Sequence, residues 1–167
     1  MVVVSGVGTV TVVLPEKAMV ALRRKAVAEG KALEELVSEA VFKQLDLDDP
    51  EAKAELHFRL CEKYIREAED FLAKKDYVQA SEKAWGAASQ MVKALAAEEG
   101  EELRSYAMLW EYVDKLGERL ADMELRHLWG RANNLHQNFY ENWMPPREVE
   151  LSVKDVKRFL EKLKEIN

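Results

Sequence analysis

The sequence predicts a mainly α protein, with an antiparallel helix bundle over residues 47–167 and a short strand–helix–helix module over residues 1–46. Three observations indicate this fold class. Only 7 Gly and 4 Pro occur in 167 residues, so long uninterrupted helices are expected. Beyond residue 50 the apolar residues recur at helical spacing. Residues 2–14, by contrast, are rich in β-branched side chains.

The first element is an expected strand over residues 2–14, with VVV and TVTVVL separated by Gly6 and Gly8. Pro15 then suits the first turn of a helix that runs to about residue 29, and Gly30 is its natural stop. A second helix is expected over residues 32–45, with apolar residues on its inner side (Leu33, Leu36, Val37, Ala40, Val41, Leu45). One strand cannot satisfy its own edges, so we expect a second copy to supply the matching strand in a homodimer.

This stretch resembles the ribbon–helix–helix module in its strand, its LPEK turn, and Gly30 followed by LEELVSEAV. The resemblance implies that outward strand side chains read bases in the major groove of DNA. Here those side chains are Thr9, Thr11 and Val13, and residues 1–46 carry equal numbers of acids and bases. Phosphate contacts supply much of the affinity for DNA, so dimerisation is favoured over DNA binding.

The segment LDLDDPEAK marks the boundary between module and bundle, with Asp48 or Asp49 as N-cap and Pro50 at the first helical position. Amphipathic patterns then predict five helices, over about residues 50–74, 77–98, 106–120, 123–143 and 152–164. Asp76 can cap the second of them, and Pro145 and Pro146 end the fourth. Small residues along 77–98 allow close helix packing, with Trp85 filling the crossing. Glu82 and Lys83 beside it form either a polar pair at this crossing or an ordinary surface pair.

Composition excludes several kinds of site. Hydrophobic residues make up 48% and charged residues 34%, which suits a globular core. The net charge of −6 lies entirely in residues 47–167, which is not the footprint of a nucleic-acid-binding protein. The single cysteine, Cys61, excludes an intramolecular disulfide and a cysteine-based metal site, and its place beside Leu60 predicts a buried thiol. We expect a soluble cytoplasmic protein without membrane spans, cofactor or metal.

The densest polar segment is WGRANNLHQNFYENW at residues 129–143. Its apolar positions form a core-facing stripe (Leu128, Trp129, Ala132, Leu135, Phe139, Trp143). Asn134, Asn138 and Glu141 share one helix face, at offsets of four and three. Asparagine is a poor helix former, so either a buried hydrogen-bond network or a ligand is expected to compensate. These three residues and Tyr140 are the candidate ligand-binding residues.

Three runs resemble the archaeal PaREP family, the Pyrobaculum repetitive-element proteins: residues 76–100, 103–116 and 132–143. The similarity extends through nearly all of the chain, including LPEK, and that family has no established function. It is similar in turn to the HEPN helical bundles, which dimerise and include RNA-cleaving toxins. The resemblance therefore implies a HEPN-like bundle and, as ligand, RNA or a nucleotide.

Many HEPN nucleases use an arginine, four to six intervening residues and a histidine, and Arg131 and His136 have this spacing. The resemblance implies a metal-independent ribonuclease in which the histidine moves protons and the arginine stabilises charge on phosphorus. Ala132 departs from the pattern, since a polar residue usually follows the arginine. Against catalysis stands a packing role, in which a neutral His136 is hydrogen-bonded to Asn, Glu or Tyr.

The sequence therefore leaves three functions open. The first is a homodimeric interaction or ligand-binding module. The second is a HEPN-type endoribonuclease, and the third is a ribbon–helix–helix DNA-binding regulator.

Overall fold

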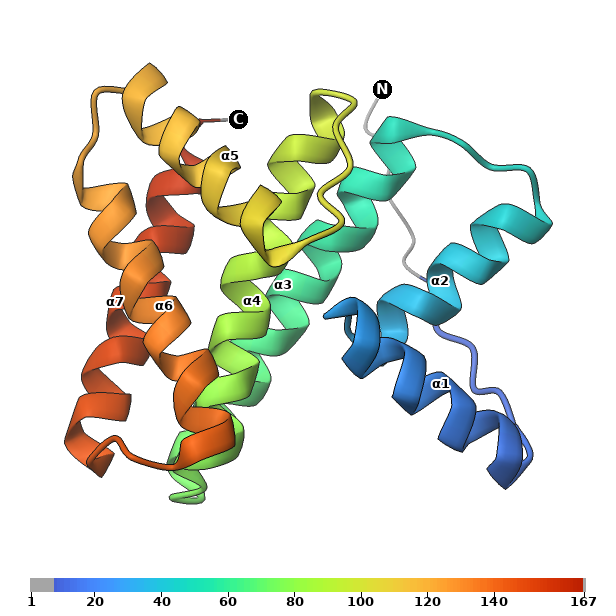
Figure 1. Cartoon of the computed structure of the whole chain (residues 1–167), viewed down its shortest axis with the longest axis horizontal. Coiled ribbons are helices and arrows are strands. Elements are labelled where there is room, and N and C mark those ends of the chain that lie inside the picture. The colour runs from blue at the N-terminus through green and yellow to red at the C-terminus, as the bar shows by residue number, and fades with distance from the viewer. Residues whose placement is uncertain (1–7, 167) are drawn as a thin grey trace. The chain divides into compact units, whose positions relative to one another are not determined.

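The computed structural model describes residues 8–166, and these form seven helices and no strand (Figure 1). The chain divides into two compact units, Met1–Leu45 and Asp46–Asn167, which we call the N-terminal unit and the bundle. The helices are α1 (Glu16–Glu29) and α2 (Leu33–Gln44) in the N-terminal unit, and α3 (Pro50–Ala73), α4 (Tyr77–Glu98), α5 (Tyr106–Arg119), α6 (Glu124–Glu141) and α7 (Pro146–Lys164) in the bundle.

The N-terminal unit is a hairpin of two short helices. Gly30 ends α1 with φ 62°, a left-handed conformation that glycine adopts at low cost. The backbone N–H of Lys31 then donates to the carbonyl of Ala26 at 2.9 Å, which closes the helix end. Ala26 and Leu36 are the buried apolar residues of the hairpin. This core is small because two helices of this length enclose little volume.

The expected strand is wrong for the part of it that the structure describes. Residues 8–14 form no strand, and Val10 and Val13 are 83% and 94% exposed. The physical reason is that a strand exists only through a ladder to a neighbour, which one chain does not provide here. Residues 2–7 lie outside the described part of the chain. The strand–helix–helix module is therefore seen only as its two helices.

The inner stripe predicted for the second helix is also largely wrong. Leu36 is buried, but Val37, Val41 and Leu45 are 37%, 49% and 66% exposed. Helical spacing shows which residues share a side of a helix, but not whether another element covers that side. Within one chain this stripe faces solvent.

The bundle is built on a long antiparallel hairpin of α3 and α4 (Figure 1). The predicted caps are confirmed, because Asp49 accepts from the backbone N–H of Glu51 and Asp76 from that of Gln79, each at 3.1 Å. Helix α4 packs against α3, α5, α6 and α7. Its small residues allow this close approach, as predicted; Ala80, Ala84, Ala87 and Ala88 are each 0% exposed.

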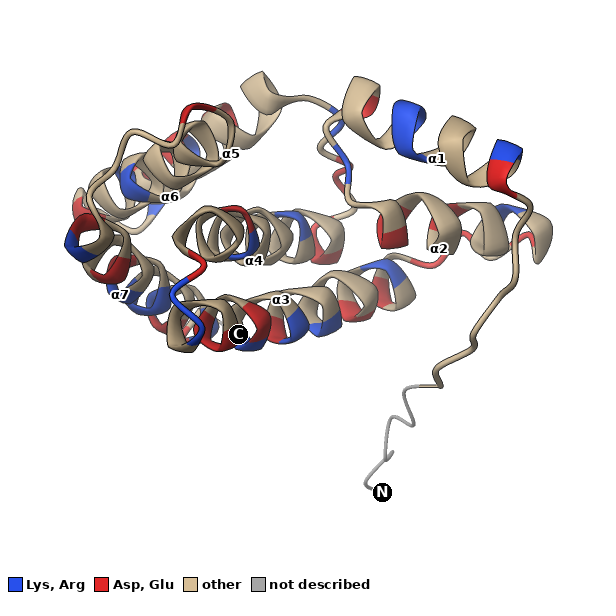
Figure 2. Ribbon diagram, turned by 90° about the horizontal axis from the view of Figure 1, so that it is seen from below, with Lys and Arg blue, Asp and Glu red and all other residues tan. Residues whose placement is uncertain are grey.

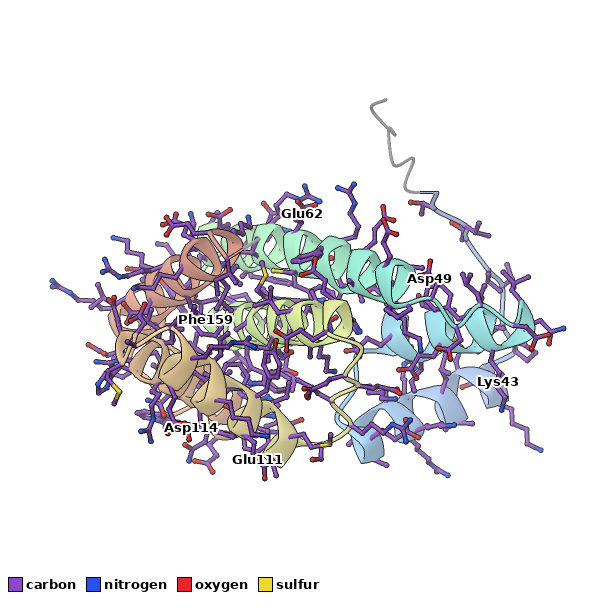
Figure 3. The ribbon with its side chains drawn as sticks, turned by 90° about the horizontal axis from the view of Figure 1, so that it is seen from above. Lys43, Asp49, Glu62, Glu111, Asp114 and Phe159 are labelled. Carbon is purple, nitrogen blue, oxygen red and sulfur yellow. The ribbon has the colours of Figure 1, made fainter. Side chains whose placement is uncertain are left out.

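Helices α6 and α7 complete the core on the other side of α4. Trp129 of α6 and Phe159 of α7 are fully buried, with ring centroids 5.9 Å apart. Figure 3 shows Phe159 inside the bundle, whereas Glu62 and Asp114 lie at its edge. Basic and acidic residues are interspersed along α3 (Figure 2). None of the helices in the described part of the chain is long and apolar enough to span a bilayer.

Two predictions near the end of α6 need correction. Helix α7 begins at Pro146, earlier than the predicted start near Ser152, because proline is favoured in the first turn of a helix. Asn142 ends α6 in a left-handed conformation with φ 47°. The chain therefore turns before Trp143, which is 49% exposed and does not join the core stripe of α6.

Candidate functional site

His136 lies at the junction of α6 and α4 and is held there by two contacts. Its Nδ1 is 3.0 Å from Oε2 of Glu82, and its ring stacks on Trp85 with centroids 3.8 Å apart and planes 19° apart. A carboxylate only accepts hydrogen bonds, so Nδ1–H donates to Glu82. In the neutral ring this makes Nε2 the basic nitrogen, and no residue of 8–166 hydrogen-bonds to it. The His136 side chain is 24% exposed.

Aromatic rings surround His136 on its solvent side. Tyr140 stands almost perpendicular to the imidazole at 5.2 Å between centroids, and Tyr106 of α5 faces it at 6.4 Å. Trp110, one turn along α5, lies 6.5 Å from Tyr106. We call Tyr106, Trp110, His136 and Tyr140 the aromatic face. Partial burial and the negative charge of Glu82 raise the pKa of Tyr140.

Tyr106 is anchored to α6 by a short hydrogen bond. Its hydroxyl donates to Oδ1 of Asn133 at 2.5 Å, and the Asn133 amide donates to the carbonyl of Trp129 at 2.7 Å. Asn133 is buried, so both of its polar groups are used inside the fold. The first turn of α5 is thereby fixed beside His136.

Arg131 does not meet His136 within one chain. A spacing of five residues places two side chains about 140° apart around a helix. Arg131 accordingly points toward α7, where its Nε is 3.8 Å from Oδ2 of Asp155, and its side chain is 52% exposed. His136 points toward α4. The structure therefore brings Glu82, and not Arg131, to the histidine.

The four candidate ligand-binding residues lie in different environments. Asn138 is 0% exposed; its amide donates to Oγ of Ser81 at 2.9 Å and its Oδ1 accepts from the backbone N–H of Met144 at 2.7 Å. Asn134 and Glu141 are exposed, and Tyr140 is 65% exposed on the aromatic face. Of these four, Tyr140 is the one that lies beside His136.

The sequence did not identify the α4 and α5 residues of this site. Glu82 and Lys83 were expected to pair, but Lys83 Nζ lies 2.6 Å from Glu67 of α3 while Glu82 bonds to His136. Glu82 and Trp85 are three residues apart on α4, so helical spacing does place them on one side. No sequence signal indicated that α6 covers that side.

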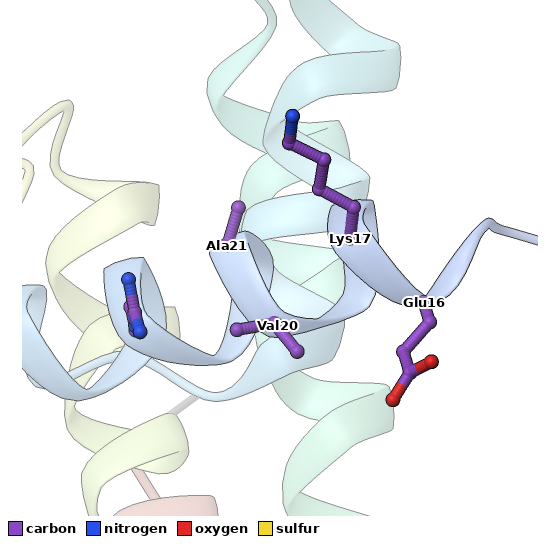
Figure 4. A pocket seen from close by; sticks show the side chains of 5 residues that line it. Glu16, Lys17, Val20 and Ala21 are labelled. Atoms are coloured by element: carbon purple, nitrogen blue, oxygen red, sulfur yellow. The ribbon is translucent and has the colours of Figure 1, made fainter.

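The described residues offer few other sites. Among residues 8–166, no group of three or more His, Cys, Asp and Glu side chains could hold a metal ion. A shallow hollow of about 460 Å³ lies along α1, and Val20 and Ala21 form its apolar part between Lys17 and Arg24 (Figure 4). All of its lining residues come from that one helix.

Comparison with known proteins relates the bundle to other proteins. The model of the archaeal PaREP1/PaREP8 family matches residues 56–160, well over half of the chain, and leaves LPEK and the N-terminal unit outside the match. A protein of Sulfolobus solfataricus with a known crystal structure is 29% identical, with a TM-score of 0.56; the alignment covers 64% of this chain and 94% of that one. No curated protein is significantly similar to the chain.

Proposed function

This chain belongs to the archaeal PaREP1/PaREP8 family, and we propose that it works as a homodimeric interaction module in which the N-terminal units of two copies pair. The observation that carries this proposal is the exposed stripe of α2. Val37, Val41 and Leu45 follow one another at intervals of four residues, so they lie on one side of the helix. Burying such side chains is worth about 1.5–3 kcal/mol each.

Neighbouring features extend this apolar surface. The segment 9–14, TVTVVL, has every side chain exposed and forms no ladder. Val20, in the hollow along α1, is 40% exposed (Figure 4). A unit of 45 residues is near the lower limit for a stable core of its own, and oligomerisation is a usual remedy. These features favour association of the unit with another protein surface.

A second copy fits this surface better than an unrelated partner. The segment 9–14 is β-branched, and antiparallel pairing with its own copy would satisfy both backbones. The N-terminal unit has six basic and five acidic residues, so two such units repel each other only weakly. A two-fold axis would also present the stripe of α2 to the same stripe of the partner.

The test is the oligomeric state of Val41→Glu in sedimentation equilibrium at micromolar concentration. Each copy contributes the change, so a loss of at least about 1.5 kcal/mol per valine weakens dimerisation on the order of a hundredfold. The control Lys43→Glu introduces the same residue two positions along α2, on the opposite side of the helix, and should leave the dimer intact. A wild-type chain that is monomeric at all concentrations, or equal behaviour of the two variants, refutes the proposal.

RNA cleavage is a second candidate, favoured by the hydrogen bond between Glu82 and His136. A carboxylate on Nδ1 leaves Nε2 as a base that could take the proton from a ribose 2′-hydroxyl as its oxygen attacks the adjacent phosphorus. The bond from phosphorus to the 5′-oxygen would break, the imidazolium would return the proton to that oxygen, and the products would be a 2′,3′-cyclic phosphate and a 5′-hydroxyl. Arg131 of the same chain points away, so phosphate charge would need an arginine from another copy in a dimer of bundles. This candidate predicts that His136→Ala abolishes metal-independent RNA cleavage. If the wild-type chain does not cleave RNA, or cleaves it no faster than His136→Ala does, the RNA-cleavage candidate is refuted.

No described feature favours the DNA-binding alternative. The exposed side chains of Thr9, Thr11 and Val13 offer two hydroxyls and no cation, and residues 1–46 carry no net charge. Direct readout of base edges relies mainly on Arg, Lys, Asn and Gln. The DNA-binding alternative would require a salt-dependent affinity for duplex DNA that is lost in the double variant Thr9→Ala/Thr11→Ala.

A further inference from the structure

The aromatic face gathers most of the exposed aromatic side chains of the bundle. In residues 8–166 the aromatic residues more than a third exposed are Tyr106, Trp110, Tyr140 and Trp143. Two of these four, Tyr106 of α5 and Tyr140 of α6, contact the ring of His136, and Trp110 lies next to Tyr106. Large exposed aromatic groups are uncommon on protein surfaces, and Tyr and Trp are enriched where proteins bind one another. This concentration is not needed for the core, which Trp129 and Phe159 already fill.

Two rings of the face are anchored to the fold. Tyr106 is fixed by the hydrogen bond from its hydroxyl to Asn133, and His136 by Glu82 and by stacking on Trp85. Tyr140 stands almost perpendicular to His136. Rigid rings lose little conformational entropy on binding, which favours their use as anchors.

The charges around the aromatic face favour a cationic partner over an anionic one. Glu82 uses Oε2 for His136, and its Oε1 accepts no hydrogen bond from any residue of 8–166. The nearby arginines of α6, Arg126 and Arg131, each lie beside an aspartate of α5 or α7. The bundle is acidic, and residues 47–167 carry the whole net charge of −6. The carboxylate of Glu82 would repel a negatively charged polymer such as RNA and attract a cationic segment.

We propose that the aromatic face binds a partner protein through an arginine-bearing segment, whose guanidinium groups lie over the rings of Tyr106 and Tyr140 and pair with Glu82. Arginine suits this surface better than lysine, because its planar guanidinium stacks on aromatic rings while still donating to a carboxylate. The proposal goes beyond dimerisation through the N-terminal unit and does not depend on it, since all the residues involved belong to the bundle.

The test is a fluorescence-anisotropy titration of the full chain with a labelled oligo-arginine peptide at near-physiological salt. Tyr106→Ala and Tyr140→Ala should each weaken binding about two- to fivefold, the value of one exposed cation–π contact. Tyr140→Phe keeps the ring and should bind like wild type. Glu82→Gln should also weaken binding, whereas Glu161→Gln, which removes an exposed carboxylate from α7, should leave it unchanged.

Two comparison ligands distinguish recognition of arginine from general attraction of cations and from RNA binding. An oligo-lysine peptide of equal length should bind more weakly than the arginine peptide, because it gains little from stacking. Single-stranded oligouridine should bind more weakly still. Equal affinity for both peptides, unchanged binding in the alanine variants, tighter binding of the RNA, or no binding of the arginine peptide at all would each overturn the proposal.

Discussion

Replacing Asn138 by alanine should destabilise the bundle by about 3 kcal/mol. Asn138 is fully buried and joins three segments, since it lies on α6, donates to Ser81 of α4 and accepts from Met144 in the loop before α7. Ser81 in turn donates to the carbonyl of Tyr77 at 2.7 Å, so its hydroxyl is already oriented to accept from the Asn138 amide.

The magnitude follows from three contributions. The buried N–H of Met144 would lose its partner, at a cost of about 1–3 kcal/mol. The neutral hydrogen bond to Ser81 adds about 0.5–1.5 kcal/mol. The carboxamide also leaves a small void, which costs more because the packed core relaxes only partly. For a chain of this size, about 3 kcal/mol lowers Tm by roughly 6–12 °C.

Urea denaturation followed by tryptophan fluorescence is a suitable assay. All four tryptophans lie in the bundle, so the signal reports on the unit that contains Asn138. Asn134→Ala is a matched control, because it removes the same side chain from an exposed position of the same helix and should change stability by no more than about 0.5 kcal/mol. Ser81→Ala should cost less than Asn138→Ala, since it leaves the Met144 bond in place. If Asn138→Ala proves no more destabilising than Asn134→Ala, the buried network does not hold the α6–α7 turn.

The remaining predictions concern two glycines and the cysteine. Gly130→Ala should stabilise the bundle by about 0.5–1 kcal/mol in the same assay, because an added Cβ meets nothing within 4 Å in the middle of α6. Gly86→Val should instead cost about 1–3 kcal/mol, because a Cβ there already lies 3.2 Å from the buried ring of Tyr64; a neutral or stabilising effect would show that the ring moves freely. Burial raises the pKa of the Cys61 thiol to about 12, so at pH 8 a thiol reagent should label the native chain far more slowly than the urea-unfolded chain. Equal labelling rates would contradict the buried position of Cys61.

The sequence alone determined most of the helices of this protein and its family. Asp49, Asp76, Gly30 and Pro50 act through their own backbone neighbours, so their effect on helix ends is readable without tertiary information. The run 76–100 resembles the PaREP family, and the family match includes all of it. The start of α7 was missed because Pro145 and Pro146 were read as a stop, whereas the second of them also begins the next helix.

Only the tertiary structure decided which of these surfaces meet. Glu82 and His136 are 54 positions apart, and their contact depends on α6 lying across α4. Helical periodicity fixes the side of the helix on which a residue lies, but it does not name the element packed there. For the same reason the sequence predicted Val37, Val41 and Leu45 to be inside, and the fold leaves them exposed. The sequence also placed Asn138 and Asn134 on one polar face, but in the fold Asn138 is buried and Asn134 is exposed to solvent.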